Sequence, residues 1–242
     1  DENKVIKDIT TWEDFVTFPP LDGHDWSESI EFTKNVDRNE YLQMCIISGG
    51  LFERSHFLMG FEDALVNYMV EPDAMTALLS AIADWKIGQI TRVIDILNPD
   101  VIMYHDDWGN KSNLFMRPDV WRKIIKPLQA KIVDTVKSAD KIMMHHADCI
   151  CEPIVEDMVE IGIDIWQGVI PQNNIKKIQK DLNGRMAMMG GIDAPLIEHP
   201  NPNEGKIRAE VRRCIDEYCP QGHFIPCIPN IFPLFDEVRV HY

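Results

Sequence analysis

Two segments of the sequence concentrate the side chains that do acid–base or metal chemistry. His105-Asp106-Asp107-Trp108 ends one apolar run, and His145-His146-Ala147-Asp148 ends another. In an extended strand, side chains alternate between the two faces, so His146 and Asp148 point the same way and His145 points the other way. An imidazole beside a carboxylate suits either a metal site or an imidazole that is oriented for proton transfer. A hydrogen-bonded pair with only a structural role fits the same spacing.

The neighbouring carboxylates Asp106 and Asp107 allow two interpretations. One carboxylate can face the interior and take part in metal or acid–base work, whereas the other can cap the following helix or turn. Cys149 and Cys151 follow the second segment, but one intervening residue is too few for a standard two-cysteine zinc knuckle. These residues are therefore candidates for catalysis or metal binding, but they do not identify the reaction.

Six apolar runs of strand length must position these residues. They alternate with amphipathic stretches, which is typical of βαβ units and a parallel sheet. The predicted strands lie within residues 41–50, 100–109, 141–148, 164–170, 185–193 and 223–230. The predicted helices span residues 74–97, 120–138 (with a kink or break at Pro127), 151–161, 175–182 and 204–219.

Polar and aromatic residues gather where these strands are expected to end. Ligands bind at the carboxyl ends of parallel strands, which meet on one face. We therefore expect one site around a common mouth. Its candidate members are Asp106, Asp107, Trp108, His146, Asp148, Trp166, Gln167, Asp193 and Asn230.

The first 40 residues do not follow the alternation. Lys4–Ile9 is predicted as a strand, and Thr10 with Glu13 has the pattern of a capping box before a short helix. No linker rich in glycine and serine divides the chain. We therefore expect one barrel domain over residues 1–242, with an N-terminal arm at 1–40 and six βα units at 41–242.

Composition narrows the function classes. With 24 Lys+Arg and 39 Asp+Glu, the net charge is 24 − 39 = −15. Such an acidic surface repels phosphate backbones and anionic lipid, which argues against binding of nucleic acid or membranes. No signal peptide is visible, and the six cysteines lack a disulfide spacing, so a cytoplasmic location with reduced thiols is expected. Glycine-rich nucleotide motifs and G-x-S-x-G are absent from the sequence.

Five motifs in a fixed order resemble the uroporphyrinogen decarboxylase superfamily, which includes corrinoid-linked methyltransferases. The resemblance runs from about residue 40 to the end. Its motifs are Ser48–Phe52 with Met59–Asp63; His105–Gly109 with Phe115–Pro118; His146–Asp148 with Pro153 and Gly162–Ile165; Met189–Asp193; and Gly222–Cys227.

The resemblance implies an α/β fold, a TIM (β/α)8 barrel with its site at the carboxyl face. It also implies that the first two barrel strands precede the Gly49-Gly50 segment, so that the six strands here would be the third to the eighth. Six strands cannot close an eight-stranded barrel. We therefore expect the natural protein to be longer at its N-terminus.

The two branches of the superfamily imply different sites. The decarboxylase branch carries a tyrosine where Leu58 stands and a histidine where Asn230 stands, so this sequence departs from both visible positions. The methyltransferase branch binds zinc through H-x-C and a distant cysteine. His146 matches that histidine, Asp148 replaces the first cysteine, and Asn230 or Cys227 would take the distant position. Zinc on His146, Asp148 and Cys227 is compatible with this pattern, and so is a metal-free site in which Asp148 orients His146.

These observations favour a methyltransferase-like enzyme that moves a methyl group to or from a corrinoid protein. The alternatives are a decarboxylase of a porphyrinogen or smaller carboxylate, and a non-catalytic binder of a tetrapyrrole or corrinoid protein. The expected catalytic residues are His146, Asp148, Asp106 and Asp107, and the expected substrate-binding residues are Trp108, Trp166, Gln167, Asp193 and Asn230. The expected partners are a small-molecule substrate or tetrapyrrole, a corrinoid protein and a second copy in a homodimer.

Overall fold

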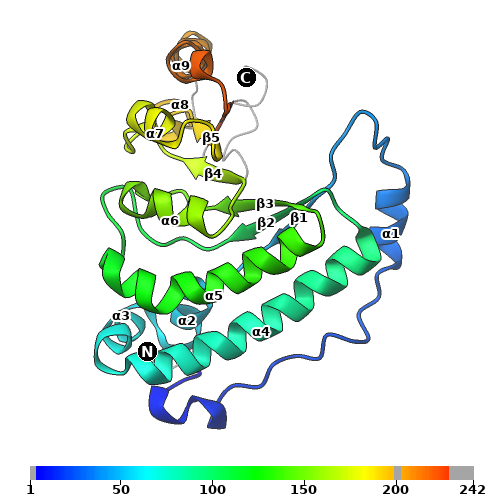
Figure 1. Cartoon of the computed structure of the whole chain (residues 1–242), viewed down its shortest axis with the longest axis vertical. Helices are drawn as coiled ribbons and strands as arrows, with labels where there is room; N and C mark the ends of the chain where they lie inside the picture. The colour runs from blue at the N-terminus through cyan, green and yellow to red at the C-terminus, as the bar shows by residue number, and fades with distance from the viewer. Residues whose placement is uncertain (1–3, 199–202, 229–242) are drawn as a thin grey trace. The chain divides into compact units, whose positions relative to one another are not determined.

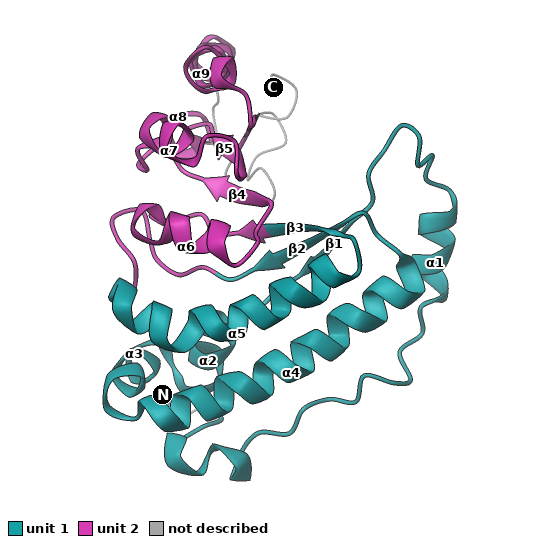
Figure 2. Cartoon of the chain, viewed as in Figure 1, with its two compact units in different colours: residues 1–106, 116–144 teal, residues 107–115, 145–242 magenta. Residues whose placement is uncertain are grey.

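The computed structural model describes residues 4–198 and 203–228. The chain divides into two compact units, which Figure 2 shows in different colours. Unit 1 comprises residues 1–106 and 116–144, and unit 2 comprises residues 107–115 and 145–242. The expectation of a single barrel domain stays a prediction.

The predicted α/β fold is confirmed. Six strands follow one another in chain order in one sheet (Figure 1): β1 (Met44–Ile47), β2 (Val101–His105), β3 (Ile142–His146), β4 (Ile165–Val169), β5 (Ala187–Gly191) and β6 (Phe224–Cys227). The pairs β1–β2, β4–β5 and β5–β6 are parallel, with Met44 opposite Val101 and Met188 opposite Phe224. Each strand lies inside one of the six apolar runs.

Unit 1 contains the first strands of the sheet and is otherwise mostly helical. Its helices are η1 (Ile9–Asp14, 3-10), α1 (Ser27–Lys34), α2 (Leu51–Met59), α3 (Phe61–Val70), α4 (Pro72–Leu97) and α5 (Pro118–Ser138). The long helices α4 and α5 pack side by side (Figure 1). Proline at the first turn suits α4 and α5, because the missing N–H has no partner within the helix there. The two helices predicted at residues 74–97 and 120–138 are confirmed.

Of the kink or break predicted at Pro127, the break is wrong and the kink stays a prediction. Helix α5 runs from Pro118 to Ser138 with Pro127 inside it. A proline removes one main-chain hydrogen bond from a helix. The buried stripe of α5, which includes Trp121, Ile125 and Ile132, packs along the whole helix and keeps it continuous.

Unit 2 repeats the strand–helix alternation with shorter helices. They are η2 (Glu152–Ile154, 3-10), α6 (Val155–Glu160), α7 (Ile175–Leu182), α8 (Ala194–Ile197), α9 (Glu204–Tyr218) and η3 (Cys219–Gln221, 3-10). Asn183 ends α7 in the left-handed region at φ 47°. The predicted helix at 151–161 occurs as two short pieces, η2 and α6.

Of the N-terminal expectations, the strand and the Thr10 cap are wrong, while the short helix occurs as the 3-10 helix η1. Residues 4–8 form no strand; instead, the main-chain N–H groups of Val5 and Ile6 both donate to the carbonyl of Leu58. Asp8, not Thr10, caps the 3-10 helix η1, and its side chain accepts a hydrogen bond from the N–H of Thr10. The cap is therefore the aspartate immediately before the helix, and not the threonine of the capping-box pattern.

Helices α2 and α3 were not predicted from the sequence. They fill most of the long gap between β1 and α4 and begin after Gly50 and Gly60. Among the described residues, no helix is long and apolar enough to cross a membrane.

Candidate active site

His105 ends β2 in unit 1, and a carboxylate orients its ring. The Nδ1 atom of His105 lies 3.0 Å from Oε2 of Glu53, which belongs to the first turn of α2. Both side chains are largely buried. The carbonyl of His105 accepts a hydrogen bond from the N–H of Gly50, so the main chain of this residue is also anchored to the start of α2. Neither His105 nor Glu53 was predicted as a site residue.

Asp106 supports the same helix. Its carboxylate accepts hydrogen bonds from the N–H groups of Phe52 (3.1 Å) and Glu53 (2.9 Å), and the residue is fully buried. Gly50 makes this approach feasible, because a Cβ there would lie 2.3 Å from the Cβ of Asp106. Asp106 thus caps α2, the helix after the preceding strand. Its predicted catalytic role stays a prediction.

Asp107, the second carboxylate, has a different environment in unit 2. Its Oδ1 accepts a hydrogen bond from the N–H of Asp148 at 3.0 Å. The loop after β2 is therefore joined to the loop after β3. Of the Asp106-Asp107 pair, Asp106 caps a helix, but that helix precedes it in the chain instead of following it. The predicted inward catalytic position of the other carboxylate stays a prediction.

The two histidines at the end of β3 have different partners. The ring of His145 stacks on Trp108 with centroids 4.0 Å apart and planes 18° apart. The Nδ1 atom of His146 is hydrogen-bonded to Oε1 of Gln167 in β4. All four residues are buried. Trp108 therefore packs in the interior, and its predicted contact with substrate stays untested.

Unit 2 holds the loop after β3 through Trp166 and Asn173. The indole Nε1 of Trp166 donates to the carbonyl of Ala147 at 3.0 Å. The side-chain oxygen of Asn173 accepts from the N–H of Cys151 and of Glu152, while its amide nitrogen donates to the carbonyl of Cys149. Trp166 is the second residue of β4, so the prediction that it sits where that strand ends is wrong.

A bulge in β4 explains that difference. The pairing of β4 with β5 shifts between Gln167 and Val169, around Gly168 at φ 93°. A Cβ on Gly168 would lie 2.9 Å from the carbonyl oxygen of Ala147. A glycine bulge lets β4 continue beyond the apparent polar end of the run and turns the neighbouring side chain. Asn173 carried no sequence signal, because nothing in Gln172-Asn173-Asn174 distinguishes it from an ordinary turn.

Asp193 follows β5, as expected. Its N–H donates to Oε1 of Glu210 at 2.8 Å, and Glu210 in turn pairs with Arg213. Burial works against the charged form of Glu210, but the bonds from Arg213 and Asp193 prevail and lower its pKa. The Oδ1 atom of Asp193 is buried without a hydrogen bond among the described residues. Asn230 lies outside the described residues.

A buried lysine in unit 1 was also not predicted. Lys86 of α4 is 2% exposed, and its Nζ donates to the carbonyl of Ser48 at 2.6 Å. Burial, followed by repulsion from Arg54, lowers its pKa to about 8. A signal was present: Lys86 stands between Ile82 and Ile90 at four-residue spacing, in a stripe that is otherwise apolar.

Two thiols of unit 2 have raised pKa values. Burial raises the pKa of Cys227 to about 11, against the opposing effect of a hydrogen bond from Gln167. The sulfur of Cys151 lies 3.4 Å from that of Cys149, and burial raises the pKa of Cys151. Cys151 and Cys227 are therefore weak nucleophiles.

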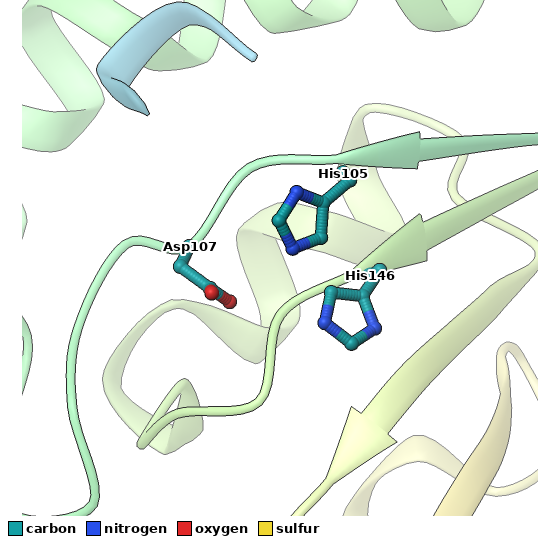
Figure 3. A group of neighbouring side chains, drawn as sticks. All are labelled: His105, Asp107 and His146. Atoms are coloured by element: carbon teal, nitrogen blue, oxygen red, sulfur yellow. The ribbon is translucent and has the colours of Figure 1, made fainter. Parts of the chain in front are cut away.

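Two potential metal ligands come together in the described part of unit 2. Asp107 and His146 each offer a ligand atom, and these atoms lie within 4.8 Å of each other. Figure 3 shows a ring nitrogen of His146 turned toward the Asp107 carboxylate. Of the predicted set of His146, Asp148 and Cys227, this pair contains only His146. Spacing within the predicted strand 141–148 favoured Asp148 over Asp107, which is distant in the sequence.

Comparisons with known proteins identify the family. The model of the family "Uroporphyrinogen decarboxylase (URO-D)" matches residues 4–227. A methyltransferase from Methanosarcina mazei has a similar structure, with a TM-score of 0.70 and 19% sequence identity over 88% of this chain. The match covers 60% of that methyltransferase chain, so this chain spans well under its full length. No curated protein matches. The resemblance inferred from the five motifs is confirmed: this chain belongs to the uroporphyrinogen decarboxylase (URO-D) family.

Proposed function

We propose that this chain transfers a methyl group between a small methylated substrate and a corrinoid carried by a partner protein. Membership of an enzyme family and a fold similar to that of a methyltransferase support the proposal. The observation that carries it is His146, a buried imidazole at the end of β3 that is held at Nδ1 by Gln167 and lies near the Asp107 carboxylate.

The chemistry requires a group that manages charge on the atom losing the methyl group. When the bond between the methyl carbon and a heteroatom breaks, both electrons remain on the heteroatom, which then takes a proton. Reduced corrinoid, when bound, supplies the electron pair that accepts the methyl group. His146 delivers the proton from Nε2 in this direction, and it removes the proton from an acceptor in the reverse direction.

A metal-bound version of the site is the alternative to proton transfer by His146. An imidazole and a carboxylate are donors that zinc accepts. His146 has a hydrogen-bonding partner at Nδ1, Gln167, as metal-bound histidines usually do. Asp107 and His146 would hold the ion, with His146 using Nε2, and the ion rather than a proton from His146 would stabilise negative charge on the heteroatom. Metal analysis of the purified protein tests this part: we expect about one zinc per chain in the wild type and none in His146→Ala.

Anaerobic spectroscopy with free cobalamin tests the transfer itself. Cob(I)alamin and methylcobalamin have distinct visible spectra, so each direction can be followed with a panel of methylated oxygen, nitrogen and sulfur compounds. We expect turnover by the wild type and a loss of about 100-fold or more in His146→Ala. His24→Ala, which changes an exposed histidine, serves as the matched control and should keep wild-type turnover.

Two other outcomes would replace this proposal. Release of CO2 from a porphyrinogen or a smaller carboxylate, without methyl transfer, would assign a decarboxylase. Tight binding of cobalamin without turnover of any methyl compound would assign a non-catalytic binder.

A further inference from the structure

Three side chains of unit 2 form a hydrogen-bonded series that starts at a main-chain carbonyl. The thiol of Cys227 donates to the carbonyl oxygen of Ile228, with 3.1 Å between sulfur and oxygen. The side chain of Gln167 contacts the same sulfur, and its Oε1 contacts Nδ1 of His146. The direction of each bond decides which nitrogen of His146 carries the proton.

The carbonyl of Ile228 fixes the direction at one end, because a carbonyl oxygen only accepts hydrogen bonds. Cys227 must therefore use its single S–H proton on Ile228. Toward Gln167 its sulfur acts as an acceptor, so the Gln167 contact is an N–H that donates to sulfur.

The orientation of the Gln167 amide follows. With its nitrogen on Cys227, its oxygen faces His146, and this oxygen also only accepts. If the amide were flipped, its nitrogen would face His146 and its oxygen would face the sulfur of Cys227. That oxygen would then find no proton, because Cys227 donates its S–H to Ile228. Gln167 is 4% exposed and sits at the β4 bulge next to Gly168, which limits its conformational freedom.

We infer that Cys227 and Gln167 are positioning residues that hold His146 as its Nδ1–H tautomer and make Nε2 the atom that accepts a proton or binds a ligand. The series assigns new roles to two residues predicted to contact metal or substrate: Cys227 orients the Gln167 amide, and Gln167 orients the imidazole. The bond directions stand without the proposed function, whereas the use of Nε2 in methyl transfer rests on it.

Nuclear magnetic resonance of the full chain with 15N-labelled histidine tests the tautomer directly. Long-range proton–nitrogen correlations distinguish a protonated ring nitrogen from one with a lone pair. At about pH 8 an ordinary imidazole is neutral. We expect His146, assigned by its loss in His146→Ala, to carry its proton on Nδ1 in the wild type. Gln167→Leu removes the acceptor, and the Nδ1–H form should fall below half.

A second variant separates tautomer control from packing. Gln167→Glu keeps an oxygen acceptor for Nδ1, so the Nδ1–H form should persist in it as in the wild type. Cys219→Ser is the matched control for a cysteine outside the series, and it should leave the His146 signals unchanged.

Two results would overturn the inference: a proton on Nε2 of His146 in the wild type, or an unchanged tautomer in Gln167→Leu. The test of the tautomer and the test of the proposed function can fail independently of each other. An Nδ1–H tautomer without methyl transfer would keep the inference and remove the function, and methyl transfer with the opposite tautomer would do the reverse.

Discussion

Lys86 places a cation in the interior of unit 1, and this has a consequence for stability. Its pKa falls from 10.5 to about 8 on folding, chiefly because of burial. Between these values the unfolded chain binds more protons than the folded chain, so stability rises with pH. Below about pH 8 the lysine is charged in both the folded and the unfolded chain, and the folded protein bears the full cost of burying that charge.

Replacement of Lys86 by methionine should therefore remove a pH dependence. From pH 7 to pH 9.5 we expect the wild type to gain about 2 kcal/mol in free energy of unfolding relative to Lys86→Met. Urea unfolding of both proteins at the two pH values measures this difference. Lys137→Met, at the exposed end of α5, is the control and should track the wild type at both pH values. Equal pH profiles for wild type and Lys86→Met would show that Lys86 keeps its ordinary pKa.

At the scale of the element, helix α2 depends on one aspartate, Asp106, which follows strand β2. Asp106 accepts hydrogen bonds from two N–H groups in the first turn of α2, and burial prevents water from replacing it. Hydrogen bonds to a charged group contribute about 1.5–3 kcal/mol each, and a lost cap costs up to about 2 kcal/mol.

Asp106→Ala should consequently lower the free energy of unfolding by about 3 kcal/mol. Chemical denaturation monitored by circular dichroism measures the loss. Asp216→Ala, which removes an exposed aspartate of α9, should change stability by less than about 0.5 kcal/mol. If Asp106→Ala instead abolished turnover at wild-type stability, Asp106 would be a catalytic residue and its capping role would be secondary.

The strands could be predicted from the sequence because their signal is local. Buried parallel strands form short continuous apolar runs, and all six runs contain one. Helices α2 and α3 were missed because their apolar residues do not form one regular stripe: Phe57, Val66 and Met69 are exposed, while Glu53 and Ser55 are buried. The start of each helix depends on residues outside its own apolar pattern: Gly50 and Asp106 for α2, and Gly60 for α3.

Candidate site residues were predicted by position along a strand, which selects segments but not the contacts between elements. His146 and Asp107 were named because histidine and paired aspartates stand out after apolar runs. His105 and Glu53 were missed, because their pairing joins β2 to α2 over 52 positions of sequence. Alternation along a strand cannot reveal a partner on another element, and the β4 bulge changes the alternation itself.

At the scale of the whole molecule, the net charge of −15 acts against the folded state. Folding brings these charges closer together, and their repulsion destabilises the compact chain. Salt screens exposed charges over about 10 Å at 0.1 M ionic strength. Screening of the exposed ion pairs costs little stability, because each pair contributes only about 0.3–0.5 kcal/mol. Examples are Lys177 with Asp181 and Arg208 with Glu204.

Screening of the repulsion should therefore outweigh the weakening of ion pairs. We expect NaCl between 10 and 200 mM to raise stability by about 1 kcal/mol, which corresponds to an increase of about 2–4 °C in Tm for a domain of this size. Differential scanning fluorimetry at constant pH and buffer measures the shift. KCl should give the same shift as NaCl at equal ionic strength, since screening depends on ionic strength alone. A fall in Tm with salt would show that local ion pairs, rather than the excess of carboxylates, dominate the electrostatics of the folded chain.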